Sequence, residues 1–87
     1  MMKKILVVDD EKIFRESLYH WFLEEGFEVT PVDSGEEALK VFEVDRYDII
    51  LLDIKMPGIS GLELLGKIIH IDPNATIIMI TAFASVS

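Results

Sequence analysis

The chain has 87 residues, of which 51% are hydrophobic, and its eight basic and sixteen acidic side chains give a net charge of −8. This length limits it to one small domain, and the hydrophobic share excludes an intrinsically disordered chain. The acidic balance argues against direct nucleic-acid binding, which needs Lys and Arg on phosphates. No cysteine is present to form a disulfide or a thiolate metal site.

Targeting and membrane signals are missing from the sequence. No apolar run approaches the roughly 18 to 20 residues that a membrane-spanning helix needs. The basic start at residues 1–4 is followed by only four apolar residues, too few for a secretory signal peptide. We therefore expect a soluble, cytoplasmic protein without a membrane partner.

The N-terminal third predicts a strand, a helix and a second strand. Residues 4–8 are a short, largely apolar run of the kind found in buried parallel strands. Residues 11–25 carry apolar side chains at helical spacing, and Gly26 is a natural helix stop. Residues 27–32 alternate like a strand, and Pro31 within them favours a place at the edge of the sheet.

The middle of the chain predicts a helix followed by a third strand. Ser34 and Glu37 form a capping box, which opens a helix that is expected to reach about residue 44. Residues 48–52 are a second continuous apolar run, again typical of a strand buried on both faces.

The C-terminal third predicts a turn, a helix and a fourth strand. Residues 56–58, Met-Pro-Gly, are a strong turn signal. Residues 61–71 follow as a helix and residues 75–80 as an apolar strand. The apolar face expected for the helix consists of Leu62, Leu65, Ile68 and Ile69. The alternation of strands and helices along the chain is the signature of an α/β fold with a parallel sheet.

Acidic residues follow two of the apolar strands. Asp9 and Asp10 end the first, and Asp53 ends the third. If these strands are neighbours, three carboxylates meet at the rim where α/β sheets bind ligands. Two carboxylates about 5 Å apart repel by roughly 3 kcal/mol at an effective dielectric of 20, so the cluster is costly unless a cation or a proton lies within it, and it implies a function. Carboxylate oxygens suit Mg²⁺. Helix capping by Asp9 or Asp10 is the simpler alternative, but it leaves Asp53 unexplained.

In combination these landmarks resemble a known family. The acidic pair at residues 9–10, Asp53, the Lys-Met-Pro-Gly run at residues 55–58, Gly61 and the strand-end Thr81 occur in the order found in response-regulator receiver domains of two-component systems. The resemblance covers the whole chain. It implies a flavodoxin-like, doubly wound parallel sheet with strand order 2-1-3-4. The stretch from Thr81 also resembles receivers of sigma-54-activating regulators.

The resemblance implies a phosphorylation switch rather than an enzyme. Asp53 would accept a phosphoryl group from a sensor histidine kinase. Asp10, Asp53 and the backbone carbonyl of Lys55 would ligate Mg²⁺, and Asp9 would act largely through a bound water. Thr81 would hydrogen-bond the phosphoryl group and move on activation. Taken without the resemblance, Thr81 is equally well a strand-end hydroxyl bonded to local backbone.

The family also has a helix 4, a strand 5 carrying a lysine, and a helix 5, which would lie beyond Ser87. Residues 1–87 are therefore expected to be a single, truncated receiver domain whose switching is impaired.

Two rival functions remain open. In the first, the exposed edge of residues 76–80 pairs with a second copy, so that the chain is an assembly module, a homodimer or higher oligomer with a vestigial metal site. In the second, the chain is a small Mg²⁺-dependent phosphatase. That class uses a second Asp two residues after its nucleophile, where this chain has Lys55.

Overall fold

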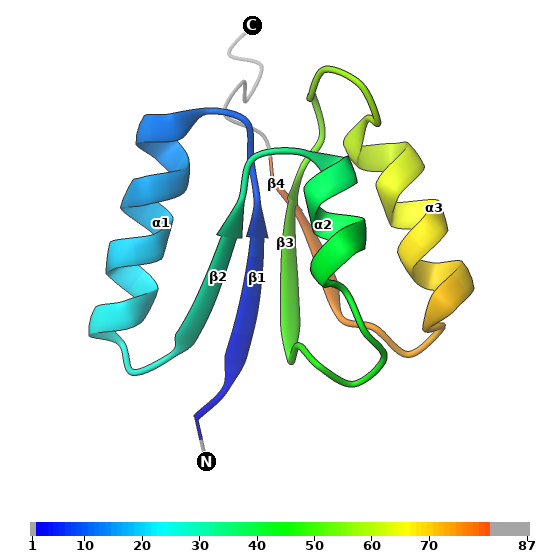
Figure 1. The fold of residues 1–87 in the computed structure, drawn as a ribbon. Helices are drawn as coiled ribbons and strands as arrows, with labels where there is room; N and C mark the ends of the chain where they lie inside the picture. Colours follow the sequence, from blue (N-terminus) through cyan, green and yellow to red (C-terminus); the bar gives the residue numbers. More distant parts are fainter. Residues whose placement is uncertain (1, 81–87) are drawn as a thin grey trace, which may run out of the picture.

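Strands and helices alternate along the chain, as the sequence predicts (Figure 1). The computed structural model describes residues 2–80. Within this range, no helix has the length and apolar character that crossing a bilayer requires. The element bounds are β1 Lys4–Val8, α1 Lys12–Glu24, β2 Glu28–Val32, α2 Gly35–Val41, β3 Ile49–Asp53, α3 Gly61–Ile71 and β4 Ile77–Ile80.

The four strands form one parallel sheet in the order β2-β1-β3-β4, which confirms the predicted order. Strand β2, which contains Pro31, lies at one edge, where a residue without an N–H group is tolerated. The two central strands, β1 and β3, pair directly, with Val8 opposite Leu52. Consequently the residues that follow Val8 and Leu52 leave the sheet side by side.

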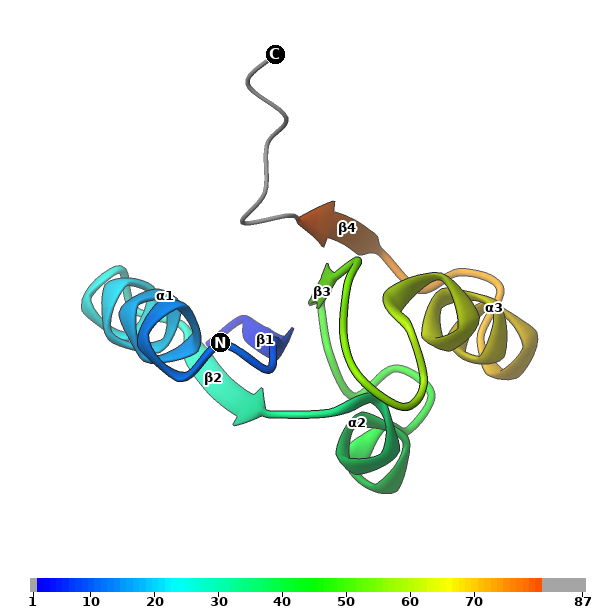
Figure 2. The ribbon, with the colours of Figure 1, turned by 90° about the horizontal axis from the view of Figure 1, so that it is seen from above.

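Helices cover the two faces of the sheet unequally (Figure 2). Helix α1 packs on one face against β1 and β2, and α2 and α3 pack together on the other. The larger core cluster lies on the α2–α3 face and the smaller on the α1 face. The larger cluster consists of Leu6, Val8, Ala38, Phe42, Ile50, Leu52, Met56, Leu64 and Ile68, and the smaller of Ile5, Val7 and Leu51.

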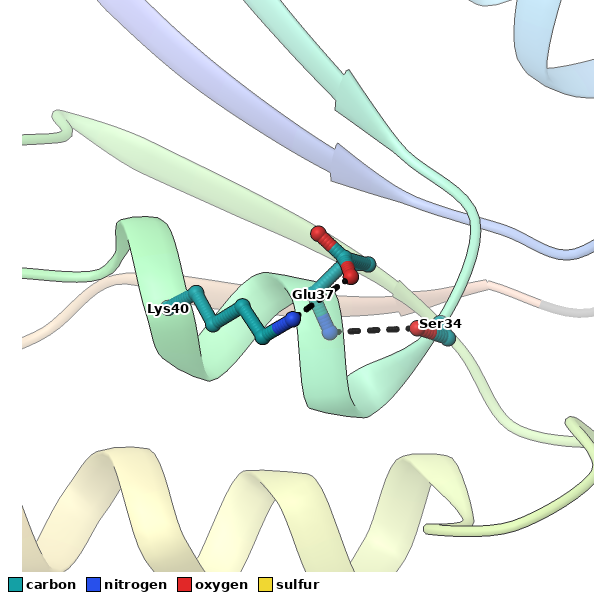
Figure 3. A network of polar contacts seen from close by, with 3 residues as sticks. All are labelled: Ser34, Glu37 and Lys40. Carbon is teal, nitrogen blue, oxygen red and sulfur yellow. Dashed lines mark hydrogen bonds and ion pairs between the residues drawn. The ribbon is translucent and has the colours of Figure 1, made fainter.

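Helix α2 begins with the predicted cap (Figure 3). The hydroxyl oxygen of Ser34 accepts a hydrogen bond from the backbone N–H of Glu37 at 3.1 Å, and Lys40 pairs with the Glu37 carboxylate at 3.0 Å. The predicted end near residue 44 is wrong, because α2 ends at Val41. Phe42 adopts an extended conformation there and is buried in the larger core cluster.

Helix α3 has the predicted bounds but a different buried face. Its buried residues are Gly61, Leu64 and Ile68, whereas Leu62 is 63% exposed. The predicted apolar face was therefore right at Ile68, wrong at Leu62 and at Ile69, which is 38% exposed, and missed Leu64. Burial of Gly61 brings the start of α3 against the end of β3, where Asp53 lies.

Candidate metal centre

Three carboxylates meet at the carboxyl edge of the sheet. Asp9 and Asp10 follow β1 directly, and Asp53 is the last residue of β3. One carboxylate oxygen from each of the three lies within 4.8 Å of the other two. The pairing of β1 with β3 produces this convergence, as the sequence predicts. Asp9 and Asp53 are buried, and Asp10 is exposed.

The backbone and one carboxylate oxygen of Asp9 are held by neighbouring groups. Its N–H donates to the carbonyl of Val32 at 3.2 Å, and its carbonyl accepts from Nη1 of Arg15 at 2.8 Å. Its Oδ1 accepts from the N–H of Glu11 at 2.8 Å. The other oxygen, Oδ2, is buried and has no hydrogen-bond partner within the described part of the chain. A buried carboxylate oxygen without a partner lowers the stability of the folded state unless a cation or proton binds to it.

The Asp53 carboxylate is oriented by the loop that follows it. Its Oδ1 accepts from the backbone N–H of Lys55 at 3.3 Å, two residues on. The Lys55 side chain is exposed. The Lys55 N–H therefore fixes the direction of the Asp53 carboxylate at the strand end.

Burial and repulsion between carboxylates favour the protonated forms of Asp53 and Asp9. Burial raises the pKa of Asp53 from its ordinary 3.8 to about 6, and the negative charge of Asp9 adds to this effect. Burial is also the main cause that raises the pKa of Asp9, with further contributions from the charges of Asp10 and Glu11, although the N–H of Glu11 opposes the shift. The folded protein thus holds these carboxylates in an unfavourable charged state at neutral pH.

Metal-free protein should lose stability as the pH rises from about 4 to about 6. Asp53 releases its proton near 3.8 in the unfolded chain but near 6 in the folded one, so the folded state is favoured at the acid end of this window. One pKa unit corresponds to about 1.4 kcal/mol, which makes the loss on the order of 3 kcal/mol. Urea unfolding across this range checks it, and the dependence should be clearly weaker in Asp53→Asn. A parent whose stability does not fall across this range, or falls no more steeply than that of Asp53→Asn, would contradict the prediction.

The residues fit a hard divalent cation. The three carboxylates offer only oxygen ligands, and the unpartnered Oδ2 of Asp9 lies within the cluster. Mg²⁺ prefers one or two carboxylates with its remaining positions filled by water or phosphate oxygens. A cation there would also remove the repulsion that raises the pKa of Asp53.

Some predicted site residues are not tested by this geometry. Thr81 lies outside the described residues, as does the whole stretch behind the resemblance to sigma-54-activating regulators. The roles of the Lys55 carbonyl as a ligand and of a water beside Asp9 stay predictions, as does impaired switching.

The sequence interpretation missed Arg15. Its guanidinium reaches back from the first turn of α1 to the carbonyl of Asp9 at 2.8 Å. Helical side chains point toward the N-terminus of their helix, so an Arg six residues after a strand-end Asp was an available signal. Arg15 therefore ties α1 to the acidic turn.

A parallel sheet of order β2-β1-β3-β4 with acidic residues after β1 and at the end of β3 defines an α/β protein with an acidic rim whose ligands suit a cation. Residues 5–87 match the family described as response regulator receiver domain. The chain belongs to this family, as its sequence resemblance implied. Receiver domains are in general signalling modules of two-component systems rather than enzymes.

Individual relatives support this assignment. Sporulation initiation phosphotransferase F of Bacillus subtilis is 39% identical over 83 residues, which are 95% of this chain and 67% of that protein. Response regulator protein FleR of Pseudomonas aeruginosa is 36% identical over 86 residues, 99% of this chain, and the match spans only 18% of its length.

A solved structure is more similar still. The response regulator protein TrrA of Thermotoga maritima, solved in complex with Mg(2+)-BeF, is 50% identical with a TM-score of 0.88. The match covers 95% of this chain and 72% of TrrA. TrrA has also been solved in complex with the histidine kinase ThkA.

Proposed function

We propose that residues 1–87 act as a phosphoacceptor receiver module of a two-component system, with Asp53 as the accepting residue. The observation that carries this proposal is the meeting of Asp9, Asp10 and Asp53 within 4.8 Å, with a buried carboxylate oxygen of Asp9 left without a partner. Capping of α1 does not account for the cluster, because Glu11 is the N-cap residue and makes no side-chain capping bond.

The chemistry assigned to Asp53 is nucleophilic attack by a carboxylate oxygen on phosphorus. A new oxygen–phosphorus bond forms, the bond from phosphorus to the donor's leaving group breaks, and the product is an aspartyl phosphate. Because Lys55 holds Oδ1 through its N–H, Oδ2 is the oxygen available for attack. Asp9, Asp10, Asp53 and the Lys55 carbonyl would hold Mg²⁺, which would offset the repulsion between Asp53 and the incoming phosphoryl group.

We propose that the protein acts in the cytoplasm, and that its partner is a sensor histidine kinase that donates from a phosphohistidine. Support comes from TrrA, which is 50% identical to this chain and has been solved with the histidine kinase ThkA. We propose that Thr81 would hydrogen-bond the transferred phosphoryl group.

The direct test is intact-mass spectrometry after incubation with acetyl phosphate and Mg²⁺. The proposal expects one added phosphoryl group per chain, formed only when Mg²⁺ is present. An unchanged mass under conditions in which Mg²⁺ is bound would contradict phosphoacceptor function.

A second candidate function, self-association, is favoured by the edge strand β4. Among the described strands, β4 pairs only with β3. Its residue Ile78 is 47% exposed, because α1 covers β1 and β2 and no described helix covers β4 on that face (Figure 2). An apolar edge strand with unpaired backbone groups is a template for pairing with another chain. We propose a homodimer in which two β4 edges meet.

Sedimentation velocity at micromolar concentration tests this association. The parent should sediment as a dimer, and Ile78→Lys should shift it to monomer, because a charge on the pairing face disfavours burial. Ile13→Lys is a matched control, since Ile13 is 80% exposed and lies on α1, which packs against β1 and β2. A monomeric parent, or equal effects of the two substitutions, would contradict the β4 interface.

A further inference from the structure

The loop that follows Asp53 is held at its far end by a residue without a side chain. Gly61, the first residue of α3, is buried and donates its N–H to the carbonyl of Ile54 at 3.0 Å. A Cβ at this position would overlap the carbonyl oxygen of Asp53. It would also lie 2.8 Å from Cα of Ile54 and 2.9 Å from the carbonyl carbon of Asp53. All three neighbours are backbone atoms, so no side-chain rotation relieves the overlap.

The two backbone segments that meet at Gly61 are both held in place by other contacts. The backbone N–H of Ile54 donates to the carbonyl of Ile80 on β4 at 3.0 Å. Helix α3 is fixed from the other side by the buried side chains of Leu64 and Ile68. A side chain at Gly61 must therefore displace the backbone around Asp53 and Ile54, the start of α3, or both.

Displacement of this backbone would also change the position of the Asp53 carboxylate. Oδ1 of Asp53 takes its hydrogen bond from the N–H of Lys55, inside the same loop. The carbonyl oxygen of Asp53 is the atom nearest to the position that a Cβ would occupy at Gly61. The position of the carboxylate thus depends on a close backbone contact eight residues further along the chain.

The same loop is approached closely from α2. Gly35, the first residue of α2, is buried, and a Cβ there would lie 3.0 Å from Cβ of Ile59 and 3.3 Å from the Ile59 carbonyl oxygen. This contact is less severe than that at Gly61, because two of the three nearest atoms belong to the Ile59 side chain. The loop is consequently held between the first turns of two helices.

We propose that Gly61 is a positioning residue for Asp53, and that Gly35 supports it from the other side of the loop. Their missing side chains allow α3 and α2 to press the loop into the place that aims the Asp53 carboxylate at Asp9 and Asp10. This inference rests on the proposed metal and phosphoacceptor site.

Gly61→Ala tests the proposal, with Gly66→Ala as its matched control on the same helix. Gly66 has no atom within 4 Å of an added Cβ. We expect Gly61→Ala to weaken Mg²⁺ binding, measured by calorimetric titration, about tenfold or more, the loss typical of disturbed ligand support. Gly66→Ala should bind Mg²⁺ like the parent. In metal-free protein, the NMR amide shifts of Asp53, Ile54 and Lys55 should move in Gly61→Ala only.

Two further variants separate positioning from stability. Ile5→Val trims a buried side chain of β1 in the smaller core cluster, on the face of the sheet away from α2 and α3, and should lower the melting temperature without changing Mg²⁺ affinity. If Gly61→Ala does not fold, Gly35→Ala tests the positioning role instead. It should weaken Mg²⁺ binding less than is expected for Gly61→Ala.

Different results would contradict the positioning role of Gly61 and the proposed function. A folded Gly61→Ala, or failing that a Gly35→Ala, with parental Mg²⁺ affinity and parental amide shifts would overturn the positioning role. A parent that binds no Mg²⁺ would instead contradict the proposed function, and the metal-free amide shifts would still decide whether Gly61 positions Asp53.

Discussion

Asp53→Asn is expected to abolish covalent labelling by acetyl phosphate completely. An amide is a far weaker nucleophile than a carboxylate and cannot form the aspartyl phosphate. The neighbouring carboxylates are poor substitutes. Asp9 is buried, with one oxygen bonded to the N–H of Glu11, and Asp10 is exposed and follows the end of β1. Intact-mass spectrometry of parent and variant, at equal Mg²⁺ and phosphodonor, measures the difference.

Asp48→Asn is the matched control for this loss. Asp48 lies just before β3, at the opposite end of the strand from Asp53, and its Oδ2 accepts from the N–H of Lys4 at 2.7 Å. An asparagine retains an acceptor oxygen there, so the variant should fold and be labelled like the parent. Labelling that survives in Asp53→Asn would show that another residue accepts the group. Continuous turnover of the donor, in place of one stoichiometric addition, would favour the rival phosphatase function.

The sequence predicted the sheet because its signals were strong and redundant. Two apolar runs ending in acidic residues predicted β1 and β3 as central strands, and Pro31 placed β2 at an edge. The alternation of strands and helices predicted a parallel sheet, whereas the order that pairs β1 with β3 came from the resemblance to receiver domains. The convergence of the acidic residues was therefore predictable, because parallel neighbours end at the same rim.

Helix α3 shows why its buried face was not predictable from apolar side chains alone. Gly61, Leu64 and Ile68 share its buried face, but a glycine does not register as an apolar position. The predicted face consequently started from Leu62, which is 63% exposed, and shared only Ile68 with the buried residues of the helix. The close approach of Gly61 to the backbone of Asp53 was not predicted, for the same reason.

The end of α2 was missed because the usual stop signals are absent. No Gly or Pro follows Val41 before β3 begins. The chain turns instead at Asp45, whose φ of 62° lies in the left-handed region that Asp tolerates better than most residues. Burial of Phe42 outweighs the helical propensity of the residues around it.

Millimolar Mg²⁺ should raise the melting temperature of the parent, and Asp10→Asn should abolish the rise. A ligand at ten times its dissociation constant stabilises the folded state by about 1.4 kcal/mol. For a domain of this size, such a gain corresponds to a shift of about 5 to 10 °C. The relief of repulsion in the cluster is part of the effect, since burial and Asp9 already raise the pKa of Asp53 to about 6.

The comparison should use the Mg²⁺-dependent increment, because Asp10→Asn also changes the metal-free protein. Removing one carboxylate lowers the repulsion within the cluster, so the variant without metal should melt at or above the parental temperature. Loss of the increment then cannot be attributed to a folding defect. Asp45→Asn is the matched control, because Asp45 is exposed in the turn before β3, and Asn tolerates its left-handed φ. A parent without any Mg²⁺ shift, or an undiminished shift in Asp10→Asn, would contradict the assigned metal ligands.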